Sequence, residues 1–200
     1  LGKREAGDAL ISALSKNTDL SIVCATIEAL GQIGDPRAVD PLLGFLTHKE
    51  PQIRECTAAA LGKLRDSRAV NSLIAALNDE QERVRWYAAD SLGKIGNPDC
   101  VDSLMKLLAD TSARVRESAV EALGQIGNEQ AIESLIKAMQ DSDKRVAEQA
   151  AESLTSIKKM NFDSMDTVAT TFYANKDYKR AEHLLERQIA EYSKQPELQE

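Results

Sequence analysis

The side chains that most often carry out chemistry are few and scattered in this sequence. Its 200 residues include three cysteines, Cys24, Cys56 and Cys100, and only two histidines. The cysteines are too far apart for a CxxC zinc site and too few for a disulfide framework. Each falls inside a helical pattern, so we expect all three to be small apolar fillers, which suits a reducing compartment.

Motifs for nucleophilic or phosphate chemistry are missing as well. The sequence contains no GxSxG, no GxGxxG and no phosphate-binding loop. Paired carboxylates are common, but they fall on helix faces without a predicted pocket, which is typical of solvated charge. We therefore expect a protein that is not an enzyme, with no catalytic residue, metal site or cofactor.

Charge and hydropathy narrow the possible partners. The net charge of -7 disfavours a broad nucleic-acid-binding surface, because neutralising phosphates requires an excess of Lys and Arg. No run of 18 apolar residues and no signal peptide is present, so we expect no membrane association and a cytoplasmic location. The start at "LG", without an initiator Met, suggests a fragment of a longer chain.

A 31-residue period organises most of the sequence. The dipeptide Leu-Gly recurs at 30–31, 61–62, 92–93 and 123–124, and a degraded fifth copy stands at 154–155. A repeat of this length predicts a solenoid, because one unit cannot bury its own apolar face and must stack on its neighbours. We expect the Leu-Gly dipeptide to belong to the turn between units.

Each unit has the pattern of two helices. Val101, Leu104 and Leu108 form an apolar stripe on the first helix, and the stretch 84–95 forms a second one. "IGDP" and "IGNP" separate successive units. Gly34 and Gly96 can end a helix in the left-handed conformation, and the Asp or Asn that follows can cap the next helix ahead of its proline.

These features resemble HEAT repeats of the short type also found in phycobilin lyase subunits. The resemblance rests on stretches similar to "VRxxAAxxLGxIGDPRAVxPLxxxL" at 53–77, 84–108 and 115–139 and covers roughly residues 1–160. It implies an all-α superhelix, a HEAT/armadillo-like solenoid of about five repeats. Such a repeat specifies a fold more than a function.

The resemblance also raises two enzymatic possibilities. Some HEAT-type proteins are di-iron hydroxylases that use His-Glu pairs, but His48 is followed by Lys49 and His183 by Leu184, which excludes that activity. A bilin or tetrapyrrole lyase subunit, working with an acceptor protein, remains an alternative. No catalytic residue can be transferred from that resemblance.

The pattern changes near residue 160. The segment 165–189 resembles one tetratricopeptide repeat with "NKDY" as its turn, although its closing proline is displaced to Pro196. We expect residues 161–200 to form a helical hairpin or cap, separate from the solenoid of residues 1–160. The matching positions are Val168, Ala169, Phe172, Tyr178, Ala181 and Leu185.

Arg54, Arg85 and Arg116 recur at one position of the repeat. Asp79 and Asp110 each lie six residues before an arginine, which favours a structural Asp/Arg ladder between units over an anion-binding stripe. The ladder residues are then Asp79, Arg85, Asp110 and Arg116. We expect it to fail at the flanks, where His48 replaces the first Asp and Ala147 the last Arg.

The variable positions of the second helices predict a binding site. In a HEAT stack these helices line the concave side, and residue 86 points away from the apolar stripe. The row contains one tryptophan among carboxylates, which favours a protein or peptide partner with basic residues through cation–π contact. The candidate residues are Trp86, Tyr87, Asp90, Lys94, Glu55, Glu117, Glu121 and Glu148.

The function predicted from the sequence is a scaffold or adaptor that binds a protein on its concave face. Trp86 could instead pack on a neighbouring helix, and a purely structural array is a further alternative that the irregular ends disfavour. The N-terminal unit lacks a normal cap, so a homodimer through that end is expected to be possible.

Overall fold

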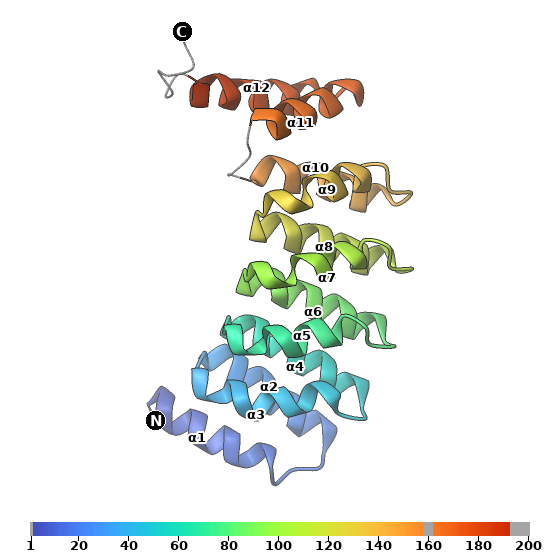
Figure 1. Cartoon of the computed structure of the whole chain (residues 1–200). Coiled ribbons are helices and arrows are strands. Elements are labelled where there is room, and N and C mark those ends of the chain that lie inside the picture. The colour runs from blue at the N-terminus through green and yellow to red at the C-terminus, as the bar shows by residue number, and fades with distance from the viewer. Residues whose placement is uncertain (1, 158–161, 193–200) are drawn as a thin grey trace.

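The computed structural model describes residues 2–157 and 162–192. Within these ranges the chain forms twelve α-helices and no strand, so the predicted all-α fold is confirmed. The helices stack in pairs along one axis from the N-terminus to the C-terminus (Figure 1). None of the helices in the described ranges is both long and apolar enough to cross a lipid bilayer.

Each repeat combines a short first helix with a longer second helix. The first helices are α1 (Lys3–Leu14), α3 (Val39–Leu43), α5 (Val70–Ala76), α7 (Val101–Leu107) and α9 (Ile132–Ala138). The second helices are α2 (Leu20–Ile33), α4 (Pro51–Leu64), α6 (Glu82–Ile95), α8 (Ala113–Ile126) and α10 (Lys144–Ser156). After α1, each first helix is preceded by one turn of 3-10 helix.

The turns between repeats follow the predicted chemistry. Gly34 and Gly96 end α2 and α6 with φ of 72° and 73°, the left-handed conformation that glycine adopts without strain. Asp35 and Asn97 then accept hydrogen bonds from backbone amides two residues on. What they cap is the 3-10 turn, so the first helix begins one turn later than the sequence pattern suggested.

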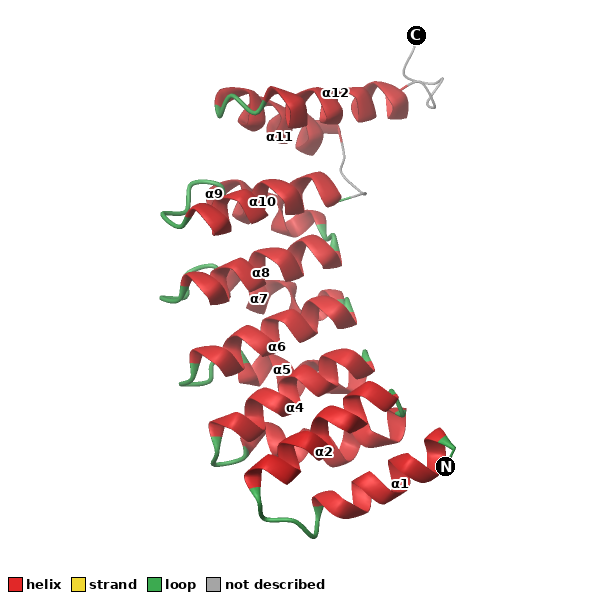
Figure 2. Ribbon diagram, turned by 180° about the vertical axis from the view of Figure 1, so that it is seen from behind, coloured by secondary structure: helices red, strands yellow, loops and turns green. Residues whose placement is uncertain are grey.

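The second helices define the inner side of the stack. Successive second helices pack directly on one another, α2 on α4, α4 on α6, α6 on α8 and α8 on α10. The first helices mainly contact the second helix of their own repeat. Figure 2 shows the second helices as a continuous row. The second helices therefore form a continuous packed row, and the face that this row turns away from the first helices is called the concave surface.

The glycine of each Leu-Gly dipeptide lies inside a second helix, where the next helix approaches. The expectation that this dipeptide belongs to a turn is therefore wrong. A methyl group on Gly31 would fall 2.9 Å from the Cα of Ala60, and one on Gly124 would fall 2.6 Å from the Cβ of Ser153. Glycine recurs here because it allows the closest contact between repeats.

The Arg–Asp ladder connects the second repeat to the third, the third to the fourth and the fourth to the fifth. Arg85 donates two hydrogen bonds to Asp110 of the following repeat, from Nε at 2.7 Å and from Nη2 at 3.0 Å. Its Nη1 donates to the backbone carbonyl of Asp79 at 2.8 Å. Arg54 with Asp79 and Arg116 with Asp141 repeat this bidentate geometry.

The ladder stops at its first flank, as expected. Val23 stands at the position of Arg54 and His48 at the position of Asp79, so the first two repeats have neither member of such a pair; His48 offers Arg54 only its backbone carbonyl, within one repeat. At the other end Ala147 ends the series. Hydrogen bonds from Arg116 hold the pKa of Asp141 below its usual value, against the opposing effect of partial burial.

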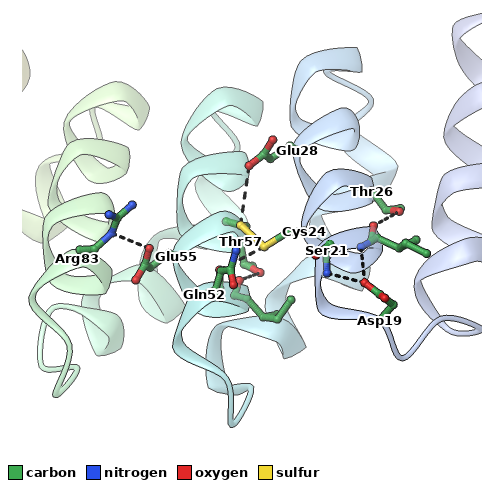
Figure 3. The surroundings of a disulfide bond; sticks show 12 residues. Asp19, Ser21, Cys24, Thr26, Glu28, Gln52, Glu55, Thr57 and Arg83 are labelled. Atoms are coloured by element: carbon green, nitrogen blue, oxygen red, sulfur yellow. Dashed lines mark hydrogen bonds and ion pairs between the residues drawn. A yellow bond between two sulfur atoms is a disulfide. The ribbon is translucent and has the colours of Figure 1, made fainter.

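A disulfide joins the first two repeats, contrary to the expectation that the cysteines are apolar fillers. Cys24 on α2 and Cys56 on α4 form this bond with their Cα atoms 5.8 Å apart (Figure 3). The two residues are brought together because their helices are adjacent, although 32 positions separate them in sequence. Cys100 is the buried, free thiol, and burial raises its pKa to about 11.

The last two helices, α11 (Phe162–Ala174) and α12 (Tyr178–Tyr192), form the expected helical hairpin. Phe172 and Ala181 are buried between them, whereas Tyr178 and Leu185 are 54% and 44% exposed. The predicted boundary at 160–161 and Pro196 lie outside the described residues. Membership of this hairpin in the tetratricopeptide class stays a prediction.

Replacing Gly124 with Ala should destabilise the protein by about 1–3 kcal/mol, because the added methyl group overlaps Ser153 at a packed helix interface. Gly44 is the matched control, since its φ is -64° and a methyl group there meets nothing within 4 Å. Gly44→Ala should leave stability unchanged or raise it by about 0.4–1 kcal/mol. The urea unfolding midpoints of the two variants measure the difference. Equal midpoints would contradict the role of Gly124 in the close approach of the helices.

Reduction of the Cys24–Cys56 disulfide should also lower stability, because the bond restricts the unfolded chain. A closed loop of this length contributes about 3–4 kcal/mol in the chain-entropy treatment. Unfolding in urea with and without dithiothreitol measures the difference. The double variant Cys24→Ser/Cys56→Ser should have the unfolding midpoint of the reduced protein, and dithiothreitol should not change it. If dithiothreitol lowered the midpoints of wild type and double variant equally, this assignment would be refuted.

Candidate functional site

The candidate site is the concave surface, formed by the side chains of the second helices that point away from the first helices. Three rows of equivalent positions run across the repeats. The first row is Gln52, Arg83, Arg114 and Arg145; the second is Cys24, Glu55, Trp86, Glu117 and Glu148; the third is Glu28, Ala59, Asp90, Glu121 and Glu152.

Trp86 lies near the middle of this surface, half-buried and packed against the core with Tyr87. The two ring centroids are 4.3 Å apart and the rings are tilted by 34°. The guanidinium carbon of Arg114, on the next helix, lies 3.5 Å from the centroid of the Trp86 ring. The cation that the sequence analysis assigned to a partner is thus supplied by the chain itself.

Arg114 belongs to a row of arginines that contact the preceding repeat. Arg83 binds Glu55 through Nε at 2.8 Å, and Arg145 lies 3.8 Å from Glu117. Glu55 raises the pKa of Arg83, by its charge first and by the hydrogen bond second. Trp86 therefore replaces a carboxylate in a recurring contact between repeats, and cation–π attraction replaces an ion pair.

The other candidate carboxylates also have partners. Asp90 binds Lys94 at 2.6 Å, and Glu148 binds Lys144 at 3.1 Å, each one turn apart on its own helix. Glu121 is exposed and accepts a hydrogen bond from Gln125. The structure places the eight candidate residues on one face, as a surface of alternating charges in place of the predominantly acidic groove expected from the sequence.

A shallow depression of about 420 Å³ lies between α8 and α10 at the end of this surface. Its lining includes Glu121, Gln125, Gln149 and Glu152. These are polar groups at the surface, suited to contact with a peptide backbone or polar side chains. Across residues 2–157 and 162–192, no three His, Cys, Asp or Glu side chains are grouped so that they could hold a metal ion.

The arginine row is the feature that the sequence analysis missed. Arg83, Arg114 and Arg145 follow each other at the 31-residue period, which was a visible signal. Their significance depends on an offset between helices that brings position 114 over position 86. Sequence periodicity alone does not fix that offset.

Comparisons with known proteins agree with the architecture. The sequence profile of HEAT repeats matches residues 7–85 and 70–155. No curated protein matches the chain. A solved complex of CpcE and CpcF of phycocyanin lyase from Nostoc sp. PCC7120 contains a similar chain, with 26% identity and a TM-score of 0.69, covering 82% of this chain and 69% of that one.

Engineered proteins share the fold at lower identity. One engineered protein is 20% identical, with a TM-score of 0.65, covering 91% of this chain and 97% of that one. A designed armadillo repeat protein in complex with the peptide (KR)4 is 19% identical, with a TM-score of 0.65, covering 89% of this chain and 97% of its own. At these identities the likeness concerns the fold alone. Since the profile spans most of the residues and the helices stack as paired repeats, the chain belongs to the HEAT-repeat family.

Proposed function

We propose that the chain is a non-enzymatic scaffold that binds a segment of a protein partner along the concave surface. The observation that carries this proposal is the partly exposed aromatic pair Trp86 and Tyr87. The equivalent repeat positions hold Cys, Glu, Ala, Ser or Gln, so the fold does not require aromatic side chains here. Exposed aromatic residues at the centre of a surface are typical anchors for binding.

The similarity to a chain of the CpcE and CpcF complex also supports a protein partner, because that relative was solved together with another protein. The basic character of the partner, expected from the sequence, required free carboxylates and an open tryptophan face. Glu55, Asp90, Glu117 and Glu148 pair with cations of this chain, and Arg114 lies on one face of the Trp86 ring. A basic partner is therefore not part of the proposed function.

Location and self-association remain parts of the proposal that need their own tests. A cytoplasmic location requires Cys24 and Cys56 to be reduced, because a disulfide persists mainly in oxidising compartments; the bond in this structure speaks against that location. A homodimer through the N-terminal end would cover Leu20 and Ile22, which are 38% and 48% exposed. Sedimentation at micromolar concentration should then show a dimer, and a monomer would remove that part.

A second candidate function is an accessory subunit that handles a bilin with its acceptor protein. The 26% identity over 82% of this chain favours it. The chain's own thiols are poorly placed to attack a chromophore, because Cys100 is buried with a raised pKa and the other two form a disulfide. Mixing with a free bilin and acceptor protein should change the absorbance spectrum, and an unchanged spectrum would remove this candidate.

Selection from a random-peptide library tests the scaffold proposal. Selected peptides should bind the Trp86→Ala variant about tenfold or more weakly than the wild type, because the aromatic anchor that the bound peptide covers is lost. Lys106→Ala is the matched control, since Lys106 is exposed on α7, away from the concave surface. Circular dichroism checks that both variants stay helical. Peptides that bind both variants equally, or a library without binders, would contradict the proposal.

A further inference from the structure

We infer that the partner presents a carboxylate side chain to Arg114, so that the centre of the concave surface recognises an acidic peptide segment. This inference rests on the proposed function and specifies the chemistry of its partner. It starts from a difference among three equivalent arginines. Arg83 and Arg145 use their charge on Glu55 and Glu117, whereas Arg114 contacts Trp86.

Arg114 keeps its hydrogen-bonding capacity. A guanidinium has five N–H donors in one plane and no acceptor. Within the described residues, no hydrogen bond or ion pair involves this guanidinium, and Arg114 is exposed. Its neighbours in the row each donate to a carboxylate or lie near one. The donors of Arg114 are therefore available to a ligand.

Trp86 holds the guanidinium in a useful orientation. A Cζ atom 3.5 Å from the ring centroid requires the planar group to lie nearly flat on the indole, since an edge-on group would overlap the ring. In that orientation the N–H donors point sideways, along the surface, and form the fork that matches a carboxylate. Stacking fixes the side chain before binding, so less conformational entropy is lost when the carboxylate arrives.

The surroundings favour an anion at this end of the helices. Arg83, Arg114 and Arg145 all lie in the first turn of their helices, where the helix dipole also favours negative charge. The nearby carboxylates Glu55 and Glu117 are each held by an arginine of the next repeat. The carboxylates of the third row lie about two turns further along the same helices, where they would repel an acidic segment. The segment is therefore expected to lie over the row of arginines.

The spacing of the repeats sets the pattern of the segment. Packed helices lie roughly 8–10 Å apart, and an extended chain advances about 3.3 Å per residue. An acidic residue at about every third position would therefore place one carboxylate opposite each repeat. A peptide of repeated Glu-Ser-Ala triplets is the probe, and peptides of Gln-Ser-Ala and Lys-Ser-Ala triplets of equal length are the controls.

Binding of the labelled peptides, measured by fluorescence anisotropy, tests the inference. The Glu peptide should bind the wild-type protein more tightly than the Gln and Lys peptides, although the net charge of -7 opposes it at long range. Arg114→Gln should weaken binding about tenfold to a hundredfold, as expected for lost hydrogen bonds to a charged group. Arg114→Lys keeps the charge but loses the planar fork and should bind with intermediate affinity.

Arg83→Gln is the matched control, because Arg83 is already paired with Glu55 and should matter less. Thermal melting confirms that each variant is folded. Tighter binding of the Lys peptide, or equal binding of the Glu peptide to wild type and Arg114→Gln, would overturn the inference. Library peptides that bind the concave surface without acidic residues would also overturn it while leaving the scaffold proposal intact. Failure of the scaffold proposal itself gives a different result, because the substitution Trp86→Ala then changes the affinity of no peptide.

Discussion

The contact between successive second helices is the constraint on which the rest of this structure depends. Glycine in one helix faces Ala or Ser in the next, so the two backbones approach closely. At two of these interfaces the serine also donates to a carbonyl of the preceding helix, Ser91 to Ala58 at 2.7 Å and Ser153 to Val120 at 3.1 Å. Because this distance is short, the second helices form one continuous packed row, and the concave surface is the face of that row that points away from the first helices.

The same contact determines which side chains can meet across repeats. It brings position 83 over position 55, position 114 over position 86, and position 145 over position 117. On the loop side, the Arg–Asp ladder joins the same pairs of repeats in the opposite direction, from Arg54 forward to Asp79. Each of the three interfaces from the second repeat to the fifth is thus held at two separate places, which fixes the rotation of one repeat on the next as well as their separation.

Much of the fold could be predicted from the sequence, because the turn and core positions recur in every unit. Gly34 and Gly96 have the predicted conformation, and the paired helices follow the apolar stripes. The details between repeats could not be predicted in the same way. The Cys24–Cys56 bond and the Arg114–Trp86 contact join residues 32 and 28 positions apart, and both depend on how far one helix slides along another. Periodicity identifies equivalent residues but does not measure that displacement.

The inner contacts of the first four interfaces also differ in mechanical strength. The disulfide between Cys24 and Cys56 is covalent, the Arg83–Glu55 and Arg145–Glu117 contacts are ionic, and the Arg114–Trp86 contact is a stacked pair. Under a stretching force the disulfide holds the first interface together, so we expect the ionic and stacked contacts of the later interfaces to separate before it. In the oxidised protein, we therefore expect any separation of the second helices on ligand binding to occur from α4 onward, in the part that includes the aromatic pair on α6.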